Sequence, residues 1–257
     1  MQVVILDSAE EMGEYGADEI LRDIDAERLD VLGVATGSSP LPVYAALARR
    51  ASPAVAGLTA FALDEYVGVA HDHPQSYHWV IHRDVTVPLG LDPARVHVPD
   101  GAASDLAAAC SAYERQIADA GGVDLQILGI GGTGHIGFNE PTSSFGSRTR
   151  IKTLTPQTRR DNARFFATPE DVPVHCVTQG LGTIMAAGRI LLFASGLGKA
   201  AAVARAVEGP LSSMCPGSIL QLHEHATVVL DREAASELTL TEYYRFVFDN
   251  RPDRHDE

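Results

Sequence analysis

Short apolar segments alternate with stretches of helical periodicity along this chain. Such segments are typical of strands buried on both faces of a sheet, and helical crossovers between them make the strands parallel. The expected strands cover residues 3–6, 31–35, 59–63, 125–130, 174–177, 190–193 and 227–230. This alternation therefore predicts an α/β protein built on a parallel sheet.

The chain shows no internal repeat, low-complexity linker or shift in composition that would mark a domain boundary. We therefore expect one domain over residues 1–249, followed by a flexible tail at 250–257. No apolar run approaches the ~18 residues that cross a bilayer, and the N-terminus lacks the pattern of a signal peptide. The three cysteines are widely spaced, so we expect buried thiols and a cytoplasmic location.

The most informative stretch is a glycine-rich loop that follows the expected strand at 125–130. Residues 128–141 read Leu-Gly-Ile-Gly-Gly-Thr-Gly-His-Ile-Gly-Phe-Asn-Glu-Pro. Glycine lets the backbone approach a ligand closely, and α/β proteins bind ligands in loops at the carboxyl ends of parallel strands. His135 and Glu140 form a titratable pair on such a loop. We therefore expect them to take part in chemistry rather than in packing.

Two further loops follow expected strands and carry polar side chains. Residues 36–39 (Thr-Gly-Ser-Ser) stand before a helix, where backbone N–H groups and hydroxyls form a seat for an anion. A plain capped turn is an equally weighted alternative for this segment. Asp64 and Glu65 are adjacent carboxylates at the end of an apolar strand. We expect one of them to have a chemical role, while capping of a helix would explain the other.

Three other patterns match known binding motifs only in part, and we do not expect the sites that the full motifs would form. Residues 129–134 satisfy G-x-G-x-x-G, but no helix follows directly and the acidic residue expected about 20 positions later is missing, which argues against a dinucleotide. Residues 195–199 lack the full P-loop pattern, although Lys199 can still contact a phosphate. The H-x-H pairs at 71–73 and 223–225 have no third candidate ligand nearby at a spacing typical of metal sites, so no metal site is predicted.

The net charge of −14 argues against a general affinity for nucleic acid or for an anionic membrane surface. A small anion is still allowed, because a few local basic groups suffice to bind a phosphate. One short segment concentrates basic residues and marks the obvious place for an anion, with a solvated charged face as the ordinary alternative. Its members are Arg148, Arg150, Lys152, Arg159, Arg160 and Arg164.

Four segments taken together resemble the glucosamine-6-phosphate deaminase (glucosamine/galactosamine-6-phosphate isomerase) family. They are Leu-Asp-Glu-Tyr-Val-Gly at 63–68, Gly-His-Ile-Gly-Phe-Asn-Glu-Pro at 134–141, Ser-Arg-Thr-Arg-Ile-Lys-Thr-Leu-Thr at 147–155 and Ala-Val-Glu-Gly at 206–209. The resemblance runs from about residue 2 to Asp231. The related 6-phosphogluconolactonases share the fold and the glycine-rich loop, but not the Asp-Glu-Tyr-Val-Gly or Phe-Asn-Glu-Pro segments. The implied fold is a modified doubly wound, Rossmann-like sheet, mainly parallel, with helices on both faces.

The resemblance implies that glucosamine 6-phosphate and water become fructose 6-phosphate and ammonia, with no organic cofactor. Asp64 matches the base that moves a proton from C2 to C1 of the open-chain sugar. His135, with Glu140 as its partner, matches the group that opens the pyranose ring. Such chemistry needs a positioned carboxylate shielded from water and a group that titrates near neutral pH. The implied phosphate ligands are Thr36, Gly37, Ser38, Ser39, Arg164 and Lys199.

One position departs from the family pattern. Thr133 stands where members usually carry Asp or Asn, and a threonine forms hydrogen bonds but holds no negative charge beside His135. We therefore expect Glu140 alone to supply the charged support, and ring opening to be slower. Two other functions stay open, namely a 6-phosphogluconolactonase-like sugar-phosphate hydrolase and a weakly active sugar-phosphate sensor.

Some members of the family are hexamers that bind the activator N-acetylglucosamine 6-phosphate between subunits. Ser143, Arg150, Lys152 and Tyr244 match the residues of that site. The resemblance therefore implies an allosteric homo-oligomer, a hexamer, whose small-molecule partners are phosphosugars. A basic cluster that is inherited but silent is the alternative.

Overall fold

The protein is built around a central parallel sheet. The computed structural model describes residues 1–50 and 52–251. The strands of this sheet are β1 (Gln2–Leu6), β2 (Val31–Val34), β3 (Thr59–Ala62), β5 (Val96–His97), β6 (Leu125–Gly129), β9 (Arg189–Ala194) and β10 (Ala226–Asp231). They lie in the order β1-β10-β9-β6-β2-β3-β5, and neighbouring strands are parallel. The prediction of a mainly parallel α/β sheet is confirmed.

The strand order changes direction between β6 and β2. From β2 the chain continues to β3 and β5, whereas from β6 it continues to β9 and β10 on the other side. Chain segments that diverge in this way leave a crevice at the carboxyl ends of the strands, where α/β proteins bind their ligands. The segments that follow β2, β3 and β6 carry the expected anion seat, Asp64 and the glycine-rich loop.

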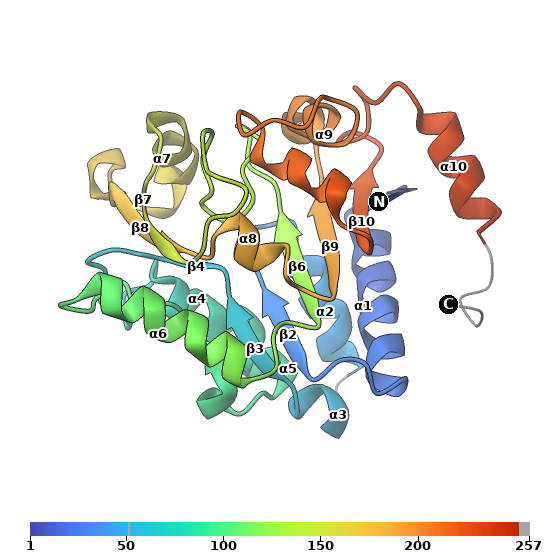
Figure 1. Cartoon of the computed structure of the whole chain (residues 1–257). Coiled ribbons are helices and arrows are strands. Elements are labelled where there is room, and N and C mark those ends of the chain that lie inside the picture. Colours follow the sequence, from blue (N-terminus) through green and yellow to red (C-terminus); the bar gives the residue numbers. More distant parts are fainter. Residues whose placement is uncertain (51, 252–257) are drawn as a thin grey trace.

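Helices cover both faces of this sheet, as predicted (Figure 1). They are α1 (Ala9–Asp25), α2 (Leu41–Arg49), α3 (Pro53–Ala56), α4 (Tyr77–Ile81), α5 (Val87–Leu89), α6 (Leu106–Asp119), α7 (Pro156–Asn162), α8 (Leu181–Ile184), α9 (Ala200–Val207) and α10 (Thr241–Asp249). α1 and α2 pack together on one face, and α6 and α8 lie on the other. α1 buries Met12, Ala17 and Ile20, which join one apolar core with strand residues such as Phe193.

A smaller antiparallel sheet is separate from the central one. Its strands, in order, are β4 (Asp64–Tyr66), β8 (His175–Thr178) and β7 (Arg150–Thr153). The expectation that residues 174–177 join the parallel sheet is therefore wrong. An apolar strand pattern does not specify its partner. β8 pairs with β4 and β7, and its Cys176 packs with Tyr66, Phe138 and Leu154 in a small core of their own.

The adjacent carboxylates Asp64 and Glu65, at the start of β4, take different roles because successive residues of a strand point to opposite faces. Glu65 is fully buried and caps the start of α4. Its carboxylate accepts hydrogen bonds from the N–H groups of Tyr77 and His78, at 2.9 and 2.8 Å, and from Ser76 Oγ at 2.7 Å. Capping therefore accounts for Glu65, and Asp64 is left facing the opposite side of β4.

The C-terminal helix α10 packs against β1 at the edge of the central sheet. The rings of Tyr15 and Phe248 lie 6.0 Å apart, and the guanidinium of Arg251 lies 3.9 Å from the Phe248 ring centroid. Asn250 and Arg251, the first residues of the expected tail, contact α10, while residues 252–257 lie outside the described residues. In the part of the chain that the structure describes, no helix has both the length and the apolar character needed to cross a membrane.

Replacing Glu65 with alanine is expected to lower the free energy of unfolding by about 3 kcal/mol, because several buried donors lose one charged acceptor. Urea denaturation followed by circular dichroism measures the change. Glu224→Ala, at an exposed position, serves as the control and should unfold like the wild type. A loss below about 1 kcal/mol for Glu65→Ala would show that the cap is dispensable.

Candidate active site

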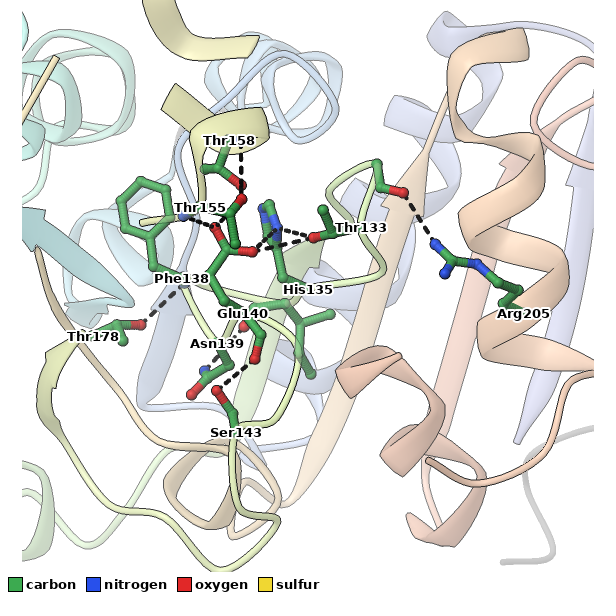
Figure 2. Close-up of polar contacts among 12 residues, drawn as sticks. Thr133, His135, Phe138, Asn139, Glu140, Ser143, Thr155, Thr158, Thr178 and Arg205 are labelled. Carbon is green, nitrogen blue, oxygen red and sulfur yellow. Dashed lines mark hydrogen bonds and ion pairs between the residues drawn. The ribbon is translucent and has the colours of Figure 1, made fainter. Parts of the chain in front are cut away.

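The glycine-rich loop after β6 folds back so that the imidazole of His135 packs on Gly131. The N–H of Gly131 donates to the carbonyl oxygen of His135 at 2.9 Å. A Cβ on Gly131 would lie 2.1 Å from the His135 ring, so the close approach requires glycine. Arg205 of α9 holds the loop from outside, through a hydrogen bond of 3.1 Å to the carbonyl oxygen of Gly132 (Figure 2).

Thr133 links the imidazole of His135 to the carboxylate of Glu140 (Figure 2). Thr133 Oγ1 lies 2.8 Å from His135 Nδ1 and donates to Glu140 Oε2 at 3.2 Å, while Nδ1 itself is 3.4 Å from the same oxygen. Since the single hydroxyl proton is directed to the carboxylate, the hydroxyl oxygen accepts a hydrogen bond from Nδ1. The proton of the neutral imidazole is thereby assigned to Nδ1, which leaves a free lone pair on Nε2.

Glu140 is buried and surrounded by hydrogen-bond donors. Thr155, the N-cap of α7, donates to Glu140 Oε1 from its N–H at 3.0 Å and from Oγ1 at 3.1 Å, and the hydroxyl of Thr158 lies 3.1 Å from that of Thr155. Burial alone would raise the pKa of Glu140, but the hydrogen bond and charge of His135, with the threonine donors, lower it to about 2. Glu140 therefore stays ionised throughout the neutral range.

Asp64 reaches the same loop from β4. Its side chain is buried, and a Cβ on Gly137 would lie 3.5 Å from Asp64 Oδ2. Burial and the neighbouring charge of Glu65 raise the pKa of Asp64 to about 8, while the nearby N–H of Phe138 and hydroxyl of Thr178 act in the opposite direction. A carboxylate whose ionised form is disfavoured in this way accepts a proton more readily than one in water.

The structure therefore brings three of the expected catalytic residues around one loop. His135 and Glu140 belong to it, and Asp64 lies against its Gly137. Because this loop follows β6 and Asp64 follows β3, the group stands at the carboxyl edge of the sheet, where the strand order changes and where α/β proteins bind their ligands.

Two expected phosphate ligands, Arg164 and Lys199, lie close enough to influence each other. Lys199 ends the turn Leu197–Lys199 after β9, and Arg164 lies in the turn Ala163–Phe165 after α7. Burial and the charge of Arg164 lower the pKa of Lys199, while Asp161 opposes them. Two cations that disfavour each other's charge are stabilised when an anion binds between them.

The segment 36–39 after β2 is not used to cap a helix. The N-cap of α2 is Pro40, and it makes no side-chain capping bond, so the alternative of a serine-capped turn is not met. Gly37 adopts a φ of +95°, and both it and Ser38 are exposed. The hydroxyl of Tyr44 fixes the start of the loop, since it exchanges hydrogen bonds of 2.9 Å with the backbone of Ala35.

The expected effector residues are only partly brought together. Arg150 Nη2 donates to Ser143 Oγ at 3.2 Å, and Lys152 lies two residues further along β7. Tyr244 does not join them within one chain. It lies on α10, on the opposite side of the molecule from β7 (Figure 1), where its hydroxyl donates to Glu208 at 3.1 Å.

The histidine pairs have ordinary structural contacts. The rings of His71 and His78 stack with centroids 4.8 Å apart, and His223 Nε2 lies 2.9 Å from the carbonyl oxygen of Ala187. Among residues 1–50 and 52–251, no cluster of three or more His, Cys, Asp or Glu side chains is arranged to hold a metal ion.

Sequence reasoning missed Thr155 and Thr178, which lie against Glu140 and Asp64. Thr155 carried a usable signal, because Thr followed by Pro is typical of a helix start. Thr178 carried none, since its place beside Asp64 depends on the antiparallel pairing of β4 with β8.

Comparison with known proteins identifies the family of the chain. A sequence profile of the family described as Glucosamine-6-phosphate isomerases/6-phosphogluconolactonase matches residues 7–229. The glucosamine-6-phosphate deaminases of Pseudarthrobacter chlorophenolicus and Streptomyces coelicolor are 55% and 53% identical to this chain, and each alignment covers 98% of both chains.

Solved structures of the same family have the same fold as this chain. A monomeric glucosamine-6-phosphate deaminase superposes with a TM-score of 0.88 at 41% identity, over 92% of this chain and 100% of that one. The 6-phosphogluconolactonase from Trypanosoma cruzi superposes with a TM-score of 0.73 at 19% identity, over 93% of this chain and 97% of that one, and shares the fold alone. The chain therefore belongs to the family of glucosamine-6-phosphate isomerases and 6-phosphogluconolactonases.

Proposed function

We propose that this protein is an enzyme that converts glucosamine 6-phosphate and water to fructose 6-phosphate and ammonia. One observation carries the proposal: Asp64 lies against the glycine-rich loop that carries the His135–Glu140 pair, at the edge of the sheet where the strand order changes direction. Relatives that are 53–55% identical over nearly their full length are named for this activity. The lactonases share only the fold, at 19% identity, so deamination is the better-supported reaction.

Ring opening is assigned to His135. Its Nδ1 is engaged by Thr133 and, through it, by Glu140, so Nε2 is the nitrogen available to take the proton of the C1 hydroxyl. The ionised Glu140 favours the imidazolium that forms, and the proton then passes to the ring oxygen as the C1–O bond breaks. The product of this step is the open-chain aldehyde.

Isomerisation is assigned to Asp64. Its carboxylate takes the proton from C2, the electron pair of that bond forms a C1–C2 double bond, and the π electrons of the C1 carbonyl move to O1, which takes a proton from the ammonium group of the substrate. The proton held by Asp64 then returns to C1 while the lone pair of the nitrogen forms a C2–N double bond. The resulting imine at C2 adds water and releases ammonia. Because burial raises the pKa of Asp64 to about 8, the ammonium group of the arriving substrate favours the ionised form and prepares the base.

We assign the binding of the substrate phosphate to the two cations Lys199 and Arg164 and to residues 36–39, which follow β2. Lys199 and Arg164 supply positive charge, and the hydroxyls and N–H groups of residues 36–39 supply hydrogen bonds. The three thiols of the chain are free, which fits the cytoplasmic location that we propose for a single deaminase domain over residues 1–249.

We also propose that the enzyme is a homo-oligomer, a hexamer, activated by N-acetylglucosamine 6-phosphate. Ser143, Arg150 and Lys152 would bind the activator's phosphate on one chain. Arg150 Nη1 is buried and has no hydrogen-bond partner among the described residues, which leaves a donor for an anion. Since Tyr244 lies on the far side of the same chain, its participation requires a second subunit.

Asp64→Asn is expected to reduce the release of ammonium and fructose 6-phosphate by at least about 10³-fold, while substrate binding measured by calorimetry is largely kept. Asp72→Asn, at an exposed aspartate, is the control and should stay fully active.

Asp64→Asn also tests the effect of the buried charge on stability. Since the pKa of Asp64 is higher in the folded protein than in the unfolded chain, ionisation lowers stability progressively from about pH 4 to pH 8. Asp64→Asn should therefore melt about 10 °C above the wild type at pH 8 but not at pH 4. Full turnover in this variant would remove Asp64 from its assigned role.

Thr133→Asp is expected to speed ring opening about threefold to tenfold, because a second carboxylate beside His135 makes the imidazole a stronger base. The measurement is kcat for the cyclic substrate as a function of pH, with the profile moving to higher pH. Thr133→Asn is the matched control, since it keeps a hydrogen-bonding side chain without the charge. Identical rates and profiles for the two variants would show that charge at this position does not matter.

Adding N-acetylglucosamine 6-phosphate is expected to lower the substrate concentration for half-maximal rate by about fivefold or more. Lys152→Ala should lose most of this response, whereas Arg160→Ala, at an exposed position in the same basic segment, should keep it. Analytical ultracentrifugation measures the assembly in parallel. Hyperbolic kinetics that the sugar phosphate leaves unchanged would refute the allosteric proposal.

A further inference from the structure

Asp64 and Thr178 face each other across the small antiparallel sheet. The register of β4 and β8 pairs these two residues directly, so their side chains lie on the same face of the sheet. Both are buried, with 6% of Asp64 and none of Thr178 exposed. A buried hydroxyl group is thus held beside the proposed base.

The same hydroxyl is tied to the glycine-rich loop (Figure 2). The N–H of Phe138 donates to Thr178 Oγ1 at 3.1 Å. A Cβ on Gly137 would lie 3.1 Å from Thr178 Oγ1 and 3.5 Å from Asp64 Oδ2, so both oxygens border the backbone of Gly137. Thr178 therefore stands where β8, the base and the loop that carries His135 meet.

The single proton of this hydroxyl has two possible acceptors. One is the carbonyl oxygen of Gln179, at a distance of 3.3 Å, and the other is the carboxylate of Asp64. Hydrogen bonds to an ionised acceptor are shorter and roughly twice as strong as those between neutral groups. Since an ionised carboxylate is the stronger acceptor, we expect the proton to turn from Gln179 to Asp64 when Asp64 is charged.

We propose that Thr178 is a positioning residue for Asp64, whose hydroxyl orients the carboxylate of the base. This role rests on the proposed function, in which Asp64 is the base for proton transfer between C2 and C1. Thr178 touches neither reacting carbon and acts only through Asp64. It supplies the donor that burial would otherwise deny to the base.

The titratable groups that surround Asp64 do not supply a donor to its carboxylate in place of Thr178. Glu65 contributes a negative charge, which disfavours ionisation of Asp64. Burial raises the pKa of the remaining titratable neighbours, so these stay neutral at pH 7; they are Tyr66, Tyr77, Tyr113 and Cys176. Of the groups that shift the pKa of Asp64, only the Phe138 N–H and the Thr178 hydroxyl lower it.

The test is the pH profile of kcat/KM for ammonium release by the full-length enzyme. Thr178→Val keeps the shape of the side chain and removes the hydroxyl. It should move the acidic limb up by about one pH unit, which lowers kcat/KM about tenfold below the limb and leaves the alkaline plateau near that of the wild type. Thr178→Ser retains the hydroxyl and should restore the wild-type limb.

Thr86→Val is the matched control. Thr86 is also buried, and its hydroxyl donates to the carbonyl oxygen of Ile81 at 3.3 Å, away from Asp64. This variant loses a buried hydroxyl of the same kind, so it reports any general loss of stability. Its pH profile should match that of the wild type. Should Thr178→Val fail to fold, Thr178→Ala compared with Thr86→Ala asks the same question.

An acidic limb that stays in place in an active Thr178→Val enzyme would overturn the proposal. So would an equal shift in Thr86→Val, or a failure of Thr178→Ser to restore the limb. These results differ from a failure of the proposed function. In that case the wild type would release no ammonium, or Asp64→Asn would turn over fully.

Discussion

The burial of three carboxylates at one edge of the sheet is the constraint on which the site depends. An ionised carboxylate removed from water is unfavourable unless hydrogen-bond donors replace its hydration. Glu65 and Glu140 receive many donors, whereas Asp64 receives few and lies beside Glu65. The pKa of Glu140 is therefore lowered to about 2 and that of Asp64 raised to about 8. Environments that separate two pKa values in this way suit one group to hold charge and the other to exchange a proton.

The hydrogen-bond donors to Glu65 and Glu140 come mostly from the first residues of helices. The carboxylates depend on these helices, and the helices depend on the carboxylates. Glu65 accepts from the first N–H groups of α4, and Glu140 accepts from Thr155 at the start of α7. Both helices are too short to be stable in isolation, so a charged acceptor at the N-terminus contributes to their formation. The carboxylates organise the local backbone as much as the backbone positions them. This mutual support explains how short, irregular segments can present side chains with defined geometry.

The central sheet and the placement of the main groups at its carboxyl edge could be predicted from sequence, because both follow from local patterns. Buried parallel strands read as apolar runs, and the loops after β2, β3 and β6 necessarily meet at one edge. The small antiparallel sheet could not be predicted. β4 follows β3 after Leu63 alone, β7 carries the charged Arg150 and Lys152, and β8 finds partners far away in sequence. The neighbours of Asp64 therefore escaped prediction, although Asp64 itself did not.

The threonine at position 133 is best understood through the same constraint. An aspartate there would add another negative charge within reach of the buried Glu140, and the two carboxylates would oppose each other's ionisation. The hydroxyl avoids that cost because it accepts from His135 and donates to Glu140, so it passes the influence of one carboxylate to the imidazole without a charge of its own. The support for His135 then depends on a single carboxylate, and that carboxylate is held by Thr155 of α7. A displacement of α7 would consequently reach the imidazole of His135 through Glu140 and Thr133.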